Sequence, residues 1–418
     1  MGSGLREGWE VRKLGEVCDL QNGFAFKSKD YINTSNTMNF RMSQIQPNAN
    51  IDLEKNPKFL PDSYAIKYKS YLLKEGDVVI AMTDLATETK ILGVPTIVPK
   101  DTRNWLQNQR VGKFFNIDYS KINLKFLRYI LSTPTINDYF KSLGRGGLQI
   151  NIGKQEILDA QIPLPPLQEQ EKIVALLDEA FLAMERAKTN AELNLQNTKE
   201  LFESYLQVVF ENCGEGWEET ILKNEVDLTT GFAFKSKFYS DKDDDILLIR
   251  GDNIMQGSFR WKDAKRWNKS EYADFEKFQM KENDIVLAMD RPWVKAGLKC
   301  ARVTKLDLPS LLLQRTARLR NKSSINNSFL YYLINSKTFT DYLLGIQEGI
   351  GVPHISGKQI ANYIFNLPSL QEQKTIVKKL NTLQAQTKKL ESIYTQKLSD
   401  LEELKKSILQ KAFSGELV

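Results

Sequence analysis

Histidine and cysteine are scarce in this 418-residue chain, which has one histidine, His354, and three cysteines. Schemes that use histidine as a general base therefore have a single candidate, and histidine-based metal sites are nearly excluded. Cys18, Cys213 and Cys300 lie far apart and form no Cys-x-x-Cys motif. This usage argues against a structural zinc site and suits a reducing cytoplasm.

Long apolar runs are also missing. No stretch is apolar over the ~18 residues that a membrane span needs, and residues 1–7 lack the apolar core of a signal peptide. We therefore expect no membrane segment and a cytoplasmic protein. Charge of one sign does not dominate either, because 58 Lys and Arg stand against 52 Asp and Glu, a formal net charge of +6. This mild basic excess permits a nucleic-acid partner without requiring one.

One stretch of the chain occurs twice. Residues 166–174 read Pro-Leu-Gln-Glu-Gln-Glu-Lys-Ile-Val, and residues 369–377 read Ser-Leu-Gln-Glu-Gln-Lys-Thr-Ile-Val. The offset of 203 (370 − 167) also relates Phe210 to Phe413 near the ends of both segments. Neither segment contains glycine or proline between its leucine and that phenylalanine, so each predicts one long helix.

Both predicted helices carry an apolar stripe spaced alternately by four and three residues, as in a coiled coil. We expect an antiparallel pair that forms a rigid spacer of roughly 65 Å at ~1.5 Å per residue, although core helices or an oligomer zipper would give the same pattern. Pro165-Pro166 marks the first start, and Ser369 with Glu372 predicts a capping box at the second. The stripe residues are Ile173, Leu177, Ala180, Met184, Ala187, Ala191, Asn194, Thr198, Leu201, Tyr205 and Val208, and the residues 203 positions after each.

The segments before the helices repeat as well. Gly-Phe-Ala-Phe-Lys-Ser-Lys occupies residues 23–29 and again 231–237, and Gln109-Arg110 matches Gln314-Arg315. The runs 78–82 and 285–289 predict strands, and residues 124–131 and 328–334 predict helices. The sequence therefore predicts two α/β (α+β) globular domains, two similar copies at 1–165 and 213–368, separated by helices at 166–212 and 369–418. Because each helix leads into the start of the other copy, we expect a circular, pseudo-two-fold arrangement with both termini close together.

These motifs resemble the specificity (S) subunit of type I restriction-modification systems. The likeness covers the whole chain and rests on the Pro-Leu-Pro-Pro-Leu-Gln-Glu-Gln run at 163–170, its counterpart at 367–373, and the Leu-Gln-x-x-Phe-Ser-Gly-Glu-Leu end at 409–417. The resemblance implies a non-catalytic, DNA-binding subunit with two target-recognition domains, each reading half of a split target in double-stranded DNA. It also implies two methyltransferase (M) subunits as partners, which carry S-adenosylmethionine, and restriction/translocase (R) subunits; this chain itself binds no cofactor.

Candidate DNA contacts come from basic residues shared by both copies and from residues that differ between them. Shared residues favour phosphate contacts, or a structural role or solvated surface, whereas residues that differ favour base readout. The glycine-rich loops at 144–147 and 349–354 can approach phosphate or be ordinary turns. The candidates are Lys27, Lys29, Arg41, Thr83, Lys90, Arg110, Arg145, Gln149 and Lys154 in the first copy, and Lys235, Lys237, Arg250, Arg291, Lys295, Arg315 and Lys358 in the second.

The candidate docking residues for the methyltransferase subunits are the repeated helix starts, Leu167, Gln168, Gln170, Leu370, Gln371 and Gln373. The main rival hypothesis is a coiled-coil adaptor that binds protein and not DNA. An enzyme is disfavoured, because Asn56-Pro57-Lys58-Phe59 lacks the second proline of the adenine-methyltransferase motif and occurs in one copy only.

Overall fold

The computed structural model describes residues 6–212, 214–294, 297–346 and 353–417. The chain divides into two compact units, of which unit 1 comprises residues 1–192 with 396–418 and unit 2 comprises residues 193–395. Each unit therefore contains one globular part and a section of each of the two long helices, α5 (Leu167–Glu211) and α10 (Leu370–Ser414). The two units are described in turn.

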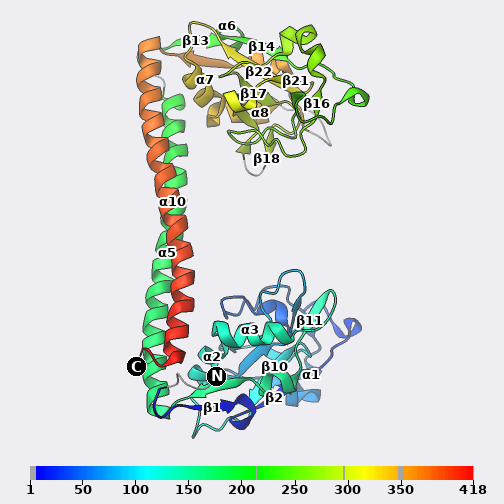
Figure 1. Ribbon diagram of the computed structural model, residues 1–418, viewed down its shortest axis with the longest axis vertical. Coiled ribbons are helices and arrows are strands. Elements are labelled where there is room, and N and C mark those ends of the chain that lie inside the picture. The colour runs from blue at the N-terminus through cyan, green and yellow to red at the C-terminus, as the bar shows by residue number, and fades with distance from the viewer. Residues whose placement is uncertain (1–5, 213, 295–296, 347–352, 418) are drawn as a thin grey trace. The chain divides into compact units, whose positions relative to one another are not determined.

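The globular part of unit 1 is built on two four-stranded sheets (Figure 1). The first has the antiparallel order β2-β10-β6-β8, with β2 (Asp19–Asn22), β10 (Val111–Phe115), β6 (Val78–Ala81) and β8 (Pro95–Ile97). The second has the order β4-β3-β9-β5, with β4 (Phe59–Leu60), β3 (Thr37–Phe40), β9 (Asn104–Gln107) and β5 (Leu72–Leu73). Two short pairs complete it, β1 (Glu10–Lys13) with β12 (Gln161–Leu164), and β7 (Thr83–Leu85) with β11 (Gln149–Asn151).

The globular part of unit 2 repeats this plan. Its main sheet has the order β14-β22-β17-β20, with β14 (Val226–Thr230), β22 (Thr316–Asn321), β17 (Ile285–Ala288) and β20 (Cys300–Arg302). The second sheet is β16-β15-β21, with β16 (Arg266–Trp267), β15 (Ile246–Ile249) and β21 (Ser310–Leu312), and the short pairs are β13 (Glu218–Ile221) with β23 (Ile364–Leu367), and β18 (Trp293–Val294) with β19 (Gly297–Leu298). Two mixed helix-and-sheet domains of one design are therefore present, as the sequence repeats predicted.

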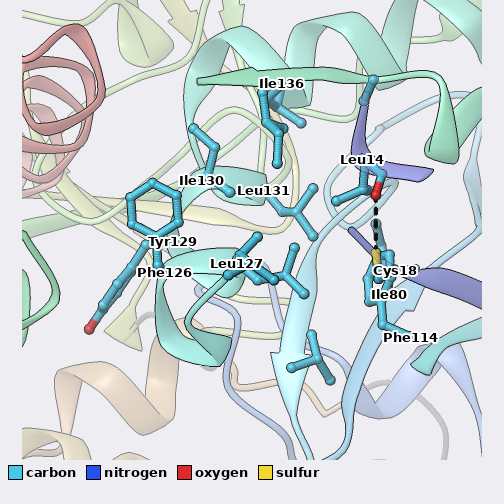
Figure 2. Packing of buried hydrophobic residues seen from close by; sticks show 14 of the residues in the cluster. Leu14, Cys18, Ile80, Phe114, Phe126, Leu127, Tyr129, Ile130, Leu131 and Ile136 are labelled. Atoms are coloured by element: carbon cyan, nitrogen blue, oxygen red, sulfur yellow. Dashed lines mark hydrogen bonds between the residues drawn. The ribbon is translucent and has the colours of Figure 1, made fainter. Parts of the chain in front are cut away.

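The strands predicted from the apolar runs form the centre of each main sheet. All four residues of β6 and all four of β17 are buried, because both faces of these strands are covered and β-branched or aliphatic side chains fit there. One face packs against helices, and Figure 2 shows this core in unit 1, where Ile80 and Phe114 of the sheet lie near Phe126, Leu127 and other apolar residues of α2.

Short helices cover this face in both units, and asparagine caps start the matched pair α2 (Leu124–Leu131) and α7 (Asn327–Ile334). The Asn123 side chain accepts hydrogen bonds from the backbone N–H of Lys125 and Phe126, and Asn326 does the same in unit 2. Both helices confirm the sequence prediction. The other short helices are α1 (Ser63–Lys67), α3 (Pro134–Leu143) and α4 (Lys154–Leu158) in unit 1, and α6 (Leu222–Glu225), α8 (Lys337–Ile346) and α9 (Gly357–Ala361) in unit 2.

The long helices pack against one another and against the globular part within each unit. In unit 1, Ile173 and Leu177 near the start of α5 share a core with Leu409 and Phe413 near the end of α10. The first turns of one helix therefore meet the last turns of the other, which makes the pair antiparallel there. In unit 2 the end of α5 and the beginning of α10 likewise belong to one core, through Phe210 and Leu380 among others.

The predicted apolar stripe is only partly confirmed near the C-terminal ends of both helices. The stripe residues Tyr205 and Ile408 pack against the cores of unit 2 and unit 1, but Leu201 is 52% exposed and its counterpart Leu404 is 46% exposed. Phe202 and Leu409, which lie beside stripe positions, also pack into these cores. The buried face therefore includes residues next to the stripe where these turns also cover a globular part.

The predicted capping box at Ser369 forms only in part. The Ser369 hydroxyl accepts a hydrogen bond from the Glu372 backbone N–H at 3.3 Å, but the Glu372 carboxylate accepts one from the indole N–H of Trp217 at 2.8 Å. Trp217, near the start of the second copy, is thus tied to the start of α10 within unit 2.

Candidate nucleic-acid interface

The loop after β6, Arg110 and the glycine-rich segment before α4 meet at one place in unit 1. The Met82 backbone N–H donates to the Arg110 carbonyl at 2.9 Å, and the Ile152 N–H donates to the Met82 carbonyl at 3.0 Å. Arg145 and Asn151 exchange backbone hydrogen bonds at 2.9–3.0 Å. Candidates from three separate segments of the sequence are therefore gathered around the two strands β7 and β11, which we call the β7–β11 ribbon.

Glycine closes the turn at the end of this ribbon. Gly146 has φ +143°, and a Cβ there would lie 1.9 Å from the Gln149 carbonyl oxygen, so no side chain fits. The turn presents Arg145, which is 84% exposed and 3.5 Å from the Glu156 carboxylate, beside the fully open Leu148. The tip of this two-stranded ribbon therefore presents a cation and an apolar side chain, and the major groove of DNA admits a β-ribbon.

Thr83, a candidate base reader, does not reach the surface. It is 2% exposed, and its hydroxyl donates to Oδ1 of the Asn151 side chain at 2.6 Å. The prediction that Thr83 contacts a base directly is therefore wrong, because its side chain is buried although it belongs to the β7–β11 ribbon. The exposed partner Asn151 was not among the sequence candidates. The only feature of the sequence that could have indicated it is its position shortly after the glycine-rich turn.

Unit 2 has the same backbone arrangement with different side chains. The Met289 N–H donates to the Arg315 carbonyl at 2.8 Å, and the Ile355 N–H donates to the Met289 carbonyl at 2.9 Å. Asp290 and His354 form an isolated antiparallel β-bridge. The Arg315 guanidinium is 67% exposed and forms a 2.7 Å ion pair with Asp290. Lys295, Gln347 and Glu348 lie outside the described residues, and Arg291 is exposed.

These hydrogen bonds also correct the alignment of the two copies. Residues 152–154 and 356–358 share a Gly-Lys step, which on sequence alone predicts that Lys154 matches Lys358. In the structure, however, Ile152 corresponds to Ile355, and Gly153 and Ser356 are the matched N-caps of α4 and α9. Lys154 therefore corresponds to Gly357, not to Lys358. Lys154 and Lys358 are both exposed but not equivalent.

Lys358 lies in a basic groove on unit 2. The groove has a volume of about 710 Å³ and is lined by Lys223, Lys277, Lys322 and Lys358, with Asp227 as an opposing charge. Such a concentration of lysines suits a phosphate backbone. Lys223, Lys277 and Lys322 were not among the sequence candidates, because they come from three separate segments.

A half-buried lysine, Lys299, lies close to the Arg315 arrangement. Burial lowers the pKa of Lys299, while the nearby carboxylates of Asp252 and Asp290 oppose that shift. Its ammonium group would be 4.0 Å from a Cβ built at Gly251, which follows Arg250. The structure therefore places Arg250, Lys299 and Asp290 in one neighbourhood of unit 2.

Arg41 and Arg250 occupy matched turns. Their backbone N–H groups donate to the side chains of Gln44 (2.8 Å) and Asn253 (2.9 Å), both of which are buried. The backbones of these arginines thus anchor turns, which is the structural role that the sequence left open as an alternative to DNA contact. The half-buried guanidinium of Arg250 pairs with Asp252 at 3.3 Å.

The Gly-Phe-Ala-Phe-Lys-Ser-Lys motif divides into structural and exposed residues. A Cβ at Gly23 or Gly231 would lie 2.2 or 2.0 Å from a backbone carbonyl oxygen, because the chain passes directly against the strand that leads to Arg110 or Arg315. Phe26 is buried in an aromatic cluster, as is its counterpart in unit 2. The exposed residues are Lys27, Lys29, Lys235 and Lys237, with Lys90 exposed beside Glu88 at 2.8 Å.

The predicted docking residues at the starts of α5 and α10 also divide into exposed and buried side chains. Gln168 and Gln371 are exposed, and Leu167 and Leu370 are at least partly so, but Gln170 and Gln373 are 0% exposed. Burial leaves these two side chains no surface to offer a partner, so their predicted docking role is wrong. They bond within their own units instead.

The comparisons with known proteins address the family. A model of the type I restriction modification DNA specificity domain matches residues 6–195 and 214–400. The chain belongs to this family. It therefore carries two copies of the specificity domain, whose role in such systems is recognition of the DNA target.

Curated relatives and solved structures agree with that assignment. The EcoAI specificity subunit of Escherichia coli is 34% identical over 62% of this chain and 44% of that protein. The MjaVIII specificity subunit of Methanocaldococcus jannaschii is 25% identical over 86% of this chain and 84% of that protein. The crystal structure of the HsdS subunit from Thermoanaerobacter tengcongensis matches with a TM-score of 0.63 and 21% identity over 100% of this chain and 99% of that one, and a chain from a type I restriction-modification complex matches with a TM-score of 0.76 and 20% identity over 99% of this chain and 100% of that one. These structural matches show the shared fold.

Two kinds of feature are absent from the described residues, namely a membrane-spanning helix and a cluster of metal-ligating side chains. No helix there is both long and apolar enough to cross a bilayer, and no group of three or more His, Cys, Asp or Glu side chains there could hold a metal ion.

Proposed function

We propose that this chain is the non-catalytic specificity subunit of a type I restriction-modification complex, and that each unit reads one half of a bipartite target in double-stranded DNA. The observation that supports it most directly is the pair of matched arrangements around Arg110 and Arg315. The backbone hydrogen bonds are the same in both units, but the side chains at the neighbouring positions differ. A common scaffold with different exposed groups is what two readers of different sequences require.

The proposed partners follow from the family. Two methyltransferase subunits that carry S-adenosylmethionine would dock on the helix starts, where Leu167, Gln168, Leu370 and Gln371 form the remaining candidate surface. Restriction/translocase subunits would join the complex for cleavage, and the whole would act on DNA in the cytoplasm. This chain contributes recognition and binds no cofactor itself.

We further propose that α5 and α10 set the length of the unread spacer in the target. Each is a continuous helix of 45 residues whose two ends belong to different units. A helix is a stiff element of fixed rise, whereas a flexible linker would not define a spacing. Insertion of one heptad into each helix, near Ala187 in α5 and at the facing level of α10, should lengthen the spacer in mapped target sites; an unchanged spacer would contradict this proposal.

The proposal is tested first by DNA binding. The full chain, assembled with the methyltransferase subunits of its own system, should bind duplex DNA with an affinity that falls steeply as salt rises, because cations on the protein replace counterions on phosphates. A coiled-coil adaptor that binds protein alone would give no such complex.

The second test addresses the division between units. Replacing the globular part of unit 2 (residues 217–367) with that of a related specificity subunit, while keeping both helices, should change only one half of the target. Sequencing methylated adenines in cells that carry the hybrid and its partners gives the readout. A change in both halves would show that the units do not read separately.

A further inference from the structure

The two units hold different side chains at one matched place. In unit 1, the residue after Met82 is Thr83, which pairs across the ribbon with Asn151. In unit 2, the residue after Met289 is Asp290, which pairs with His354. In both units the carbonyl of the shared arginine, Arg110 or Arg315, accepts the hydrogen bond of that methionine. The residue after the methionine therefore occupies the same position relative to the arginine in each unit.

This residue fixes a different partner in each unit. Buried Thr83 donates its hydroxyl proton to Oδ1 of the exposed Asn151 at 2.6 Å. Asp290 instead binds Nη1 of the exposed Arg315 at 2.7 Å. Within the described residues no side-chain partner is found for the Arg110 guanidinium, which is only half exposed.

The remaining hydrogen-bonding groups determine what each partner can read. The Thr83 hydroxyl donates to Oδ1 of Asn151, so the oxygen end of the amide faces Thr83. One lone pair on Oδ1 and both N–H bonds of Nδ2 stay available, which is the acceptor-and-donor pair that adenine N6 and N7 require. Asp290 occupies Nη1 of Arg315 and leaves Nη2 and Nε, a pair of donors that suits guanine O6 and N7.

We infer that Asn151 reads an adenine in the half-site of unit 1 and that Arg315 reads a guanine in the half-site of unit 2, with Thr83 and Asp290 as their positioning residues. This inference rests on the proposed function, because it names the bases read by the proposed readers. Both readers are exposed, and each is held by one directed hydrogen bond or ion pair to the residue that follows the matched methionine. Arg110 is the counterpart of Arg315, but the residue after its matched methionine is Thr83 and not an aspartate. Arg110 is therefore not a base reader.

Selection from a pool of random duplex DNA tests the inference, using the full chain assembled with the methyltransferase subunits of its own system. Asn151→Ala and Thr83→Val should each reduce the preference for one A·T pair in one half-site by roughly 5- to 150-fold, the range for one bidentate base contact. Thr83→Val keeps the buried volume and removes only the hydroxyl. The other half-site, read by the same molecules, reports that the variant is folded and assembled.

Arg315→Lys separates base reading from phosphate binding, because lysine keeps the charge but loses the two-pronged guanidinium. It should reduce the preference for one G·C pair in the second half-site by a similar factor, and Asp290→Asn should reduce it in the same direction. Arg110→Lys is the matched control and should leave both half-sites unchanged.

The outcomes distinguish the inference from the proposed function. If the unmodified complex selects no bipartite sequence, the proposed function is wrong and the inference falls with it. If it selects a bipartite target that Asn151→Ala and Arg315→Lys leave unchanged, or if these variants affect base pairs of another kind, the inference alone is wrong. A uniform loss of affinity for all sequences in Arg315→Lys would identify Arg315 as a phosphate contact and also overturn the inference.

Discussion

Replacing Gln170 with methionine should destabilise unit 1 far more than the same change at Gln168, two residues earlier. Gln170 is fully buried, and its Oε1 accepts a hydrogen bond from the Asn123 backbone N–H at 2.8 Å. Its Nε2 donates to the carbonyls of Lys121 and Pro165, both at 2.8 Å. The side chain thus joins the start of α5 to the segment that caps α2.

The magnitude follows from the three backbone groups that Gln170 satisfies. Methionine keeps the length of the side chain but leaves one buried N–H and two carbonyls without this partner, at about 1–3 kcal/mol for each group that finds no substitute. With partial rescue by water, a loss of about 3–5 kcal/mol is expected, a large fraction of the ~5–15 kcal/mol of a typical domain. At roughly 2–4 °C per kcal/mol for a domain of this size, the melting temperature should fall by about 6–20 °C.

Hydrogen exchange measured by mass spectrometry gives a local readout alongside urea denaturation. In Gln170→Met, amides around Asn123 and at the start of α5 should exchange faster, while peptides from unit 2 stay unchanged. Gln373→Met should produce the mirror result, because Gln373 accepts from the Asn326 N–H at 2.7 Å and donates to two carbonyls in unit 2. Equal stability of Gln170→Met and the exposed-site control Gln168→Met would refute this reasoning.

Three further predictions concern packing and pH. Leu201→Gln should change the urea-unfolding free energy by less than about 0.5 kcal/mol, because Leu201 is half exposed. Leu206→Ala should lower this free energy by about 2–5 kcal/mol through loss of core packing. If Leu201→Gln were the more destabilising of the two, Leu201 would belong to the buried stripe as the sequence predicted. Gly23→Ala should cost about 3 kcal/mol in the same assay, since its Cβ would lie 2.2 Å from a backbone oxygen, and a neutral result would show that the strand can move away. Hydrogen bonds from Arg103 lower the pKa of Asp101 to about 2. This carboxylate therefore stabilises the fold above pH ~4 and loses its effect as the pH falls from ~4 to ~2. In a plot of the unfolding midpoint against pH, Arg103→Gln should flatten the fall on the acid side, and an unaltered profile would argue against the Asp101–Arg103 pair.

The sequence repeats were sufficient to predict the architecture. Identical residues at matched positions, such as those around Gly23 and Gly231, require the same backbone contact in both copies, and the two main sheets indeed have the same strand order. The absence of helix breakers across 45 residues likewise predicted α5 and α10. These features are local or repeated, and a single sequence displays both kinds.

The roles of individual polar residues were harder to predict because their partners are distant in sequence. Gln170 binds residues 47 and 49 positions away, and Thr83 binds Asn151 across 68 positions. A glutamine in a helix start has the same sequence signal whether it faces solvent or three buried backbone groups. The one-residue error in aligning Lys154 with Lys358 has a similar origin, since register is set by hydrogen bonds and not by a shared dipeptide.

Unit 1 takes part of its core from a segment that follows unit 2, with the Phe413 ring packed at a tilt against Phe126 at 5.1 Å between ring centroids and Gly415 packed against Arg6. Unit 2 is one uninterrupted segment, residues 193–395. During synthesis the ribosome thus releases all of unit 2 before it delivers the last turns that unit 1 needs. The usual order, in which the N-terminal domain matures first, is reversed for these two units, because the residues of unit 1 that precede unit 2 keep an open apolar surface until the last turns of α10 are made.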